Sequence, residues 1–372
     1  MIRSIQILRG LAALAVVAFH VHLTEAKEIP VHVTPEFFML GDAGVDVFFV
    51  ISGFIMVFIQ PPPTVQRPYS QTTFLISRFT RIFPPYWLAM LPLIPLWLKW
   101  PKLFNNHCDN HVEIFRSIWL LPQDYTPLLG VGWTLIHETY FYIVVSFALF
   151  FAFRTRLVIG GLWFAMALLV FCVFNDTHFA GNRFLQLCFS PFSLTFLLGY
   201  FIGLGRSWIS NLSWPLGLFC LFAGLAGLFV NHHSIPDWGV YPDNNYLSRF
   251  FAFGLPCGLI VASALMLEAH LPKIILRLQY LGDISYALYL LHTMIITALY
   301  LGVSKLPWHG WLPSLVTAIT CFFSCLLAAA VFHEKLEVKT SRWLRAFLEN
   351  LVVKHQKKLF VPFWHRSNRG TD

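Results

Sequence analysis

The sequence predicts an all-α, polytopic membrane protein with about ten transmembrane helices and a few short interfacial helices. Of its 372 residues, 57% are apolar types and only 12% are charged, and the mean hydropathy is +0.65. Soluble domains usually contain about 25% charged residues. Apolar runs of about 20 residues, long enough to cross a bilayer, also follow one another along the chain. These observations exclude a disordered chain, a secreted disulfide scaffold and an ordinary soluble enzyme.

Ten apolar segments are long enough for spanning helices. The third is short and contains Pro84, Pro85, Pro92 and Pro95, so we expect a tilted or kinked helix there. The ten segments are Ile5–Leu23, Ala43–Ile59, Pro84–Leu98, Gly132–Phe153, Leu157–Phe174, Leu187–Gly205, Leu212–Val230, Leu247–Leu267, Ile284–Leu301 and Trp311–Phe332.

Lysine and arginine indicate the orientation, because cytoplasmic loops of membrane proteins are enriched in both. With a cytoplasmic N-terminus and ten spans, 19 of the 26 Lys and Arg residues fall on the cytoplasmic side. The other 7, Arg249 among them, fall outside. This split favours cytoplasmic N- and C-termini. The net charge of +8 reflects the same excess, and no nucleic-acid-binding module surrounds the basic residues.

Two segments are expected to lie beside the membrane rather than across it. Thr73–Phe83 is apolar but contains two arginines, which favours an interfacial helix on the cytoplasmic side. The tail 334–372 is basic with interleaved large apolar side chains, so we expect it to lie along the anionic inner leaflet.

Arg9 and His20 fall within the first span, where charged groups are costly and usually functional. Their spacing of 11 residues is close to three helical turns, so both side chains share one face at an axial separation of about 16 Å. We interpret them as a permanent cation and a titratable base that face one interior cavity. The alternative is that Arg9 extends to the inner interface and His20 is a hydrogen-bonded core imidazole.

Asp46 and Glu138 are expected near the height of His20, because the second and fourth spans run inward. A buried carboxylate beside an imidazole fixes its tautomer and raises its basicity. The alternative is a polar network that only ties helices together. His292 lies within the ninth span and shares a face with Ser285, seven residues away. Interhelical hydrogen bonding alone is the alternative for this pair.

Arg78 and Arg81 lie three residues apart and therefore point the same way from a helix. With Arg9 they form a predicted basic cluster near the cytoplasmic interface. Guanidinium groups offer forked donors that suit phosphates. Anchoring to lipid headgroups is the alternative.

Several other patterns carry no prediction of a site. His107, Cys108 and His111 lack a fourth ligand, as does the pair His232–His233, so we expect no metal. The seven cysteines lie mostly in apolar runs and are interpreted as small buried hydrophobic residues. No nucleotide-binding loop occurs. Arg9 interrupts the first apolar run, which disfavours a cleaved signal peptide.

Five stretches resemble the bacterial inner-membrane acyltransferase family 3, especially its exopolysaccharide-production (ExoZ-like) branch. The family's Arg and His signature falls on Arg9 and His20. The five stretches are IQILRGLAALAVVAFH (5–20), GDAGVDVFFVISGFIM (41–56), FLISRFTRIFPPYWL (74–88), GWTLIHETYFY (132–142) and GDISYALYLLH (282–292).

The resemblance implies a family transmembrane domain over residues 1–333 in the inner membrane, followed by the basic cytoplasmic tail 334–372. No fused periplasmic esterase-like domain is expected. The family motifs add six supporting residues to the site, namely Ser52, Trp133, Tyr142, Ser285, Tyr286 and His292.

The resemblance further implies transfer of an acetyl group from cytoplasmic acetyl-CoA, as donor substrate, to a hydroxyl of a surface polysaccharide or lipid-linked oligosaccharide. In this scheme Arg9, Arg78 and Arg81 bind the CoA phosphates. His20 is the general base, oriented by Glu138 or Asp46, and transfer is direct or passes through an acyl-imidazole. Two other functions stay open from the residues alone: a proton-coupled transporter or flippase, and a non-catalytic subunit of a polysaccharide synthesis complex.

Overall fold

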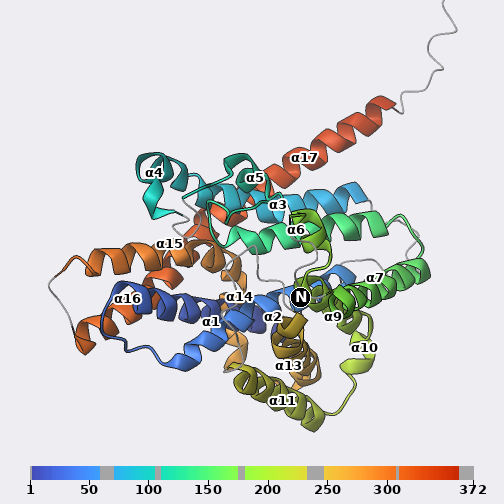
Figure 1. Ribbon diagram of the computed structural model, residues 1–372. Helices are drawn as coiled ribbons and strands as arrows, with labels where there is room; N and C mark the ends of the chain where they lie inside the picture. Colours follow the sequence, from blue (N-terminus) through green and yellow to red (C-terminus); the bar gives the residue numbers. More distant parts are fainter. Residues whose placement is uncertain are drawn as a thin grey trace, which may run out of the picture.

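The computed structural model describes residues 2–58, 71–104, 110–174, 181–232, 247–306 and 310–359. Every regular element in these ranges is a helix, so the predicted all-α class is confirmed (Figure 1). The α-helices are α1 (Arg3–Glu28), α2 (Ala43–Phe58), α3 (Gln71–Met90), α4 (Leu93–Lys99), α5 (Ile114–Trp119), α6 (Gly132–Ala148), α7 (Phe153–Phe174), α8 (Arg183–Cys188), α9 (Pro191–Leu204), α10 (Arg206–Ile209), α11 (Trp214–His232), α12 (Leu247–Arg249), α13 (Leu255–Leu267), α14 (Gln279–Asp283), α15 (Ser285–Val303), α16 (Trp311–Phe332) and α17 (Val338–Leu359).

Eight helical segments in the described ranges are long and apolar enough to cross a membrane, which confirms a polytopic membrane protein. Two of the ten expected spans fall outside this set. Helix α6 has only 17 residues, and α3 contains Arg78, Arg81 and several other polar side chains that lower its hydropathy. Both helices still pack within the bundle, where α3 contacts α6 and α6 contacts α2 and α9.

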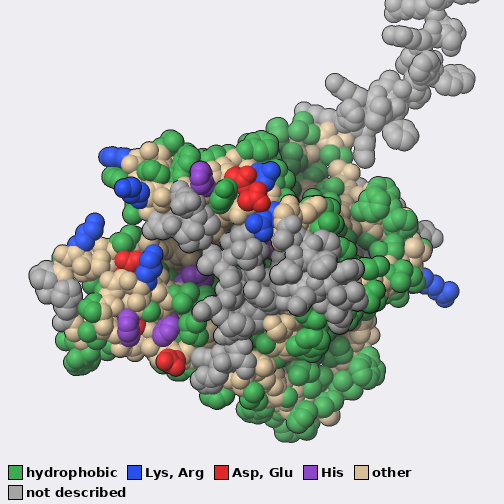
Figure 2. Space-filling model, viewed as in Figure 1, with side chains coloured by type: hydrophobic (Ala, Val, Ile, Leu, Met, Phe, Trp, Pro, Cys, Tyr) green, Lys and Arg blue, Asp and Glu red, His purple; other side chains and the backbone are tan. Residues whose placement is uncertain are grey.

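Burial separates central helices from peripheral ones. In α1, 67% of the apolar window is buried, and in the span that contains α9 the share is 72%. The corresponding shares are only 11% in α7 and 17% in α11. Hydrophobic side chains accordingly cover much of the visible outer surface (Figure 2). Helices α7 and α11 therefore present apolar faces outward, as a lipid environment requires.

Small residues bring α2 and α9 into direct backbone contact. A Cβ added at Gly53 would lie 1.9 Å from the carbonyl oxygen of Phe196, and one added at Gly199 would lie 1.9 Å from that of Val50. Such close approach of helix backbones is typical of membrane bundles. This contact fixes the rotation of α2, whose Ser52 then points toward α6.

Helices α1 and α15 run in the same direction. Arg9 at the start of α1 donates from Nη2 to the Ser285 hydroxyl at the start of α15 (3.1 Å). Farther along both helices, His20 Nδ1 lies 3.2 Å from His292 Nε2. The predicted common face of Arg9 and His20 is therefore the face that α1 turns toward α15.

Helix α3 differs from the sequence prediction. An interfacial helix at Thr73–Phe83 and a span at Pro84–Leu98 were expected, but one helix runs from Gln71 to Met90 with Pro84 and Pro85 inside it. The chain turns only at Leu91 and Pro92, before α4. The expected boundary is wrong because surrounding helices can satisfy the backbone groups that proline leaves unpaired.

The chain continues as a helix beyond α16. A π-helical segment, η7 (His333–Glu337), joins α16 to α17, which packs against α3 and then projects from the bundle (Figure 1). The described part of the predicted tail is thus helical, and residues 360–372 lie outside the described ranges.

Candidate active site

A pocket opens among α1, α2, α3, α6 and α15, with an empty volume of about 720 Å³ that includes its open mouth. Part of the lining is apolar and comes largely from α2. The polar and charged lining residues are Arg9, Ser52, Arg78, Arg81, Thr134, Glu138, Tyr142, Ser285, Tyr286 and Tyr289. Eight of the residues predicted from the sequence therefore meet in one place.

Three guanidinium groups face this pocket from two helices. Arg9 is 7% exposed, and Arg78 and Arg81 are half-buried. Arg78 donates from Nε to the Ser77 hydroxyl (3.3 Å) and lies 5.6 Å from the ring centre of Tyr142. Within the described residues, no carboxylate lies within ion-pair distance of any of the three. The cluster therefore keeps its positive charge for a bound anion.

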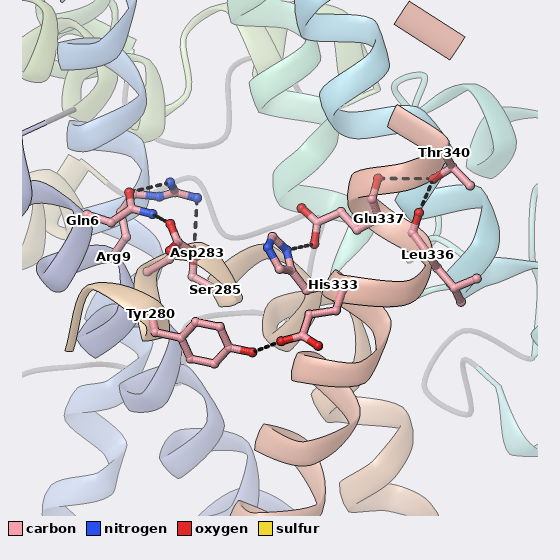
Figure 3. Close-up of polar contacts among 11 residues, drawn as sticks. Gln6, Arg9, Tyr280, Asp283, Ser285, His333, Leu336, Glu337 and Thr340 are labelled. Atoms are coloured by element: carbon pink, nitrogen blue, oxygen red, sulfur yellow. Dashed lines mark hydrogen bonds and ion pairs between the residues drawn. The ribbon is translucent and has the colours of Figure 1, made fainter. Parts of the chain in front are cut away.

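A short hydrogen-bonded chain holds Arg9 in place (Figure 3). Its two terminal nitrogens donate to different acceptors, Gln6 Oε1 (3.1 Å) and Ser285 Oγ (3.1 Å). Gln6 in turn donates to the Asp283 carboxylate (2.6 Å). These contacts span α1, α14 and α15, so the orientation of the guanidinium depends on the packing of all three helices.

The segment that follows α16 faces the same region from the other side (Figure 3). His333 Nδ1 lies 2.9 Å from Glu337 Oε2, and the Tyr280 hydroxyl donates to Glu334 (2.9 Å). The hydrogen bond to Glu334 raises the pKa of Tyr280 above its usual value. Glu337 interacts electrostatically with both Arg9 and Arg81. Glu337 follows the last matching motif and is therefore not predicted from the sequence.

Glu138 lies with the arginines rather than with His20. Its Oε1 accepts hydrogen bonds from the Ser52 hydroxyl (3.0 Å) and from the Tyr142 hydroxyl. The predicted position of Glu138 at the height of His20 is therefore wrong. Thr134 lies one turn earlier on α6. Its hydroxyl is hydrogen-bonded to that of Tyr289 (2.8 Å), which packs beside His292 on α15.

His20 and His292 form a pair outside the pocket, on the side of its lining residue Tyr289. Their ring centres are 4.7 Å apart at 73°. His292 is fully buried, whereas His20 is half-buried. Neither residue lines the pocket. Tyr289 connects the two places, because it lines the pocket and its ring also lies 5.7 Å from that of His292.

Asp46 is engaged elsewhere, so it is not the predicted partner of His20. Its Oδ2 accepts a hydrogen bond from Arg249 Nη2 (2.8 Å), and Asp42 accepts one from Nη1 (2.7 Å). Arg249 is 0% exposed and lies in α12. The sequence places Arg249 on the external side at the start of the expected span Leu247–Leu267, but it does not predict this complete burial. The guanidinium of Arg249 offsets the free-energy cost of burying the Asp46 carboxylate.

Trp133, a predicted supporting residue, lies outside the pocket. The Trp133 ring packs against those of His137 and Phe192, at centroid distances of 5.8 and 5.2 Å, and does not line the pocket. Within the described residues, no group of three His, Cys, Asp or Glu residues is arranged to hold a metal ion. His107 and Cys108 lie outside those residues.

Comparison with known proteins agrees with the sequence motifs. The family model of acyltransferase family 3, described as an acyltransferase domain, matches residues 2–333. The exopolysaccharide production protein ExoZ of Rhizobium meliloti (strain 1021) is 34% identical over 275 residues, which cover 71% of this chain and 79% of that protein. No solved structure matches. The resemblance seen in the sequence is thus confirmed: the chain belongs to acyltransferase family 3 and is a multi-pass membrane acyltransferase.

Proposed function

We propose that the protein transfers an acetyl group from acetyl-CoA to a hydroxyl of a surface polysaccharide or of its lipid-linked precursor, in the bacterial inner membrane. The observation that carries this proposal is the meeting of three guanidinium groups in one pocket without an ion-paired carboxylate. Its charged lining residues are Arg9, Arg78, Arg81 and Glu138, so the positive charges outnumber the negative.

The donor is inferred from the chemistry of this lining. Coenzyme A carries several phosphate oxygens, and forked guanidinium donors bind such groups through paired, charge-assisted hydrogen bonds. Arg81 supports this role most directly, because it makes no hydrogen bond within the described part of the chain. Arg78 adds an arginine one helical turn away on the same face.

The reaction is assigned to the far end of the same helix. Arg9 and His20 are separated by about 16 Å along α1, a length that the extended pantetheine arm of the donor can bridge. The His20 imidazole accepts the proton of a sugar hydroxyl while the hydroxyl oxygen bonds to the acetyl carbonyl carbon. The carbon–sulfur bond then breaks, and the proton passes to the CoA thiolate. An acetyl ester and free CoA result.

The acceptor is inferred from the similarity to a protein named for exopolysaccharide production. The relative's name gives a class of polymer and no particular sugar, so we propose the class only. Transport of an intact glycan or donor is disfavoured, because the family is one of acyltransferases.

The test uses membranes that contain the full protein, acetyl-CoA with a labelled acetyl group, and polysaccharide from a strain that lacks the gene. We expect His20→Ala to abolish labelling and Arg78→Ala to raise the KM for acetyl-CoA about tenfold or more. Two exposed residues outside the pocket provide matched controls, His270→Ala and Arg277→Ala, which should label normally.

Retention of labelling in correctly inserted His20→Ala would contradict the role of His20 as the base. An unchanged KM for acetyl-CoA in Arg78→Ala would contradict phosphate binding by the cluster. If the wild-type protein released no CoA and transferred no label, the enzymatic function itself would be wrong for these substrates.

A further inference from the structure

The hydrogen-bond partners of the histidine pair determine where the protons lie. His292 Nδ1 is 3.1 Å from the backbone carbonyl oxygen of Leu288, and His20 Nδ1 is 3.0 Å from that of Val16. A carbonyl oxygen only accepts hydrogen bonds. Both Nδ1 atoms must therefore carry a hydrogen.

The contact between the two rings then has one direction. His20 Nδ1 lies 3.2 Å from His292 Nε2, so its hydrogen is shared between Val16 and His292. In neutral imidazole one nitrogen donates and the other accepts. Since Nδ1 of His292 is the donor, its Nε2 is the acceptor. The remaining nitrogen of His20, Nε2, is left with a free lone pair.

We propose that His292 is the positioning residue that fixes His20 in the tautomer whose Nε2 acts as the base. This inference rests on the proposed function, because it concerns the same reaction. It assigns to a neutral imidazole the role that a carboxylate plays in many catalytic pairs. The two carboxylates expected for that role are otherwise engaged, Asp46 by Arg249 and Glu138 by two hydroxyl groups.

The surroundings of His292 indicate orientation rather than proton relay. Its Nδ1–H points at a backbone carbonyl, which does not accept a proton for onward transfer. The side chain is fully buried, and its neighbour Tyr289 directs its hydroxyl to Thr134 and Val131. When His20 takes the proton of the acceptor, its bond to His292 becomes charge-assisted and therefore stronger. His292 stabilises the imidazolium without receiving its proton.

Two substitutions at residue 292 separate this role from a merely structural one. In His292→Gln the side-chain amide reaches the place of Nε2 and can still accept from His20. In His292→Asn the shorter amide reaches only the place of Nδ1. We expect His292→Asn to lower kcat about 10- to 100-fold with an unchanged KM for acetyl-CoA, as loss of a hydrogen bond to a charged group would. We expect His292→Gln to recover most of this loss.

The inference is overturned if His292→Asn keeps the wild-type kcat, or if His292→Gln is inserted normally and yet as impaired as His292→Asn. If neither variant accumulates, nitrogen-15 spectra of the histidine-labelled wild-type protein decide. The His20 signals, identified by their loss in His20→Ala, should show an unprotonated Nε2, and an unprotonated Nδ1 would refute the proposal. Failure of the proposed function would instead appear as a wild-type protein that transfers no label from acetyl-CoA, whatever residue occupies position 292.

Discussion

Arg249 illustrates how much a single residue can depend on partners far along the chain. Its guanidinium binds Asp42 and Asp46, and it lies 5.1 Å from the ring centre of Phe192 and 5.2 Å from that of Phe253. In the sequence it lies at the start of the expected span Leu247–Leu267 and counts among the external basic residues, which favours a place at the membrane boundary. The two carboxylates that draw it inside are more than 200 residues away.

Replacement of Arg249 by methionine should destabilise the protein strongly. It would leave Asp46 buried without its cation, and breaking a buried ion pair in this way costs about 3–5 kcal/mol. Addition of Asp46→Asn should restore part of the loss, because the unpaired charge is then removed. Thermal unfolding of the purified protein in detergent measures both. A double variant no more stable than Arg249→Met would contradict a cost that arises from the buried charge.

At the active site, spacing predicts which residues share a face but not which residues touch. The interval from Arg9 to His20 correctly predicts that both lie on one face of α1, because helical periodicity is local. The partner of His20 is His292 rather than a carboxylate, and this choice depends on how α1 and α15 pack. Side-chain periodicity contains no information on that packing.

At the scale of helices, the contact between α2 and α9 explains the glycine of Ser52-Gly53-Phe54, a motif within the family-matching stretch 41–56. Gly53 lies against the backbone of Phe196, and Ser52 beside it binds Glu138. The motif therefore combines a packing residue with a residue of the pocket. The sequence motif marks both positions but does not distinguish their roles.

Substitution of Gly53 by alanine should prevent the normal approach of α2 and α9. The added methyl group would overlap the carbonyl oxygen of Phe196, so the helices must separate and the position of Ser52 changes. We expect lower thermal stability and lower activity together. Gly161→Ala in α7 is the matched control, since a Cβ there meets nothing within 4 Å and alanine favours helix more than glycine. Equal effects of the two substitutions would contradict the packing role.

At the scale of the whole molecule, the pocket assembles residues from both ends of the described chain, from Arg9 to Tyr289, and Glu337 adds its charge from beyond the family match. The class of the protein is predictable from sequence because hydropathy is a local property. The continuity of α3 through Pro84 and Pro85 and the pairing of Arg249 are not, because each depends on contacts between distant elements.

Glu337→Gln should lower the KM for acetyl-CoA. The carboxylate of Glu337 attracts Arg9 and Arg81 and therefore reduces the positive potential available to donor phosphates. Glu349→Gln is a suitable control, because Glu349 pairs with Arg345 on an exposed face of the same helix. Kinetics in membranes at constant ionic strength measure the effect. A higher KM in Glu337→Gln would show that Glu337 supports donor binding instead.

The helix that continues from α16 into α17 has a further mechanical consequence. Its helical run from Trp311 to Val352 has 42 residues, or about 63 Å at 1.5 Å per residue. The hydrocarbon core of a bilayer is only about 30 Å thick. About half of this rod must therefore stand in water or among headgroups. Because α17 packs against α3, which carries Arg78 and Arg81, this extension links α16 to the helix of the basic cluster.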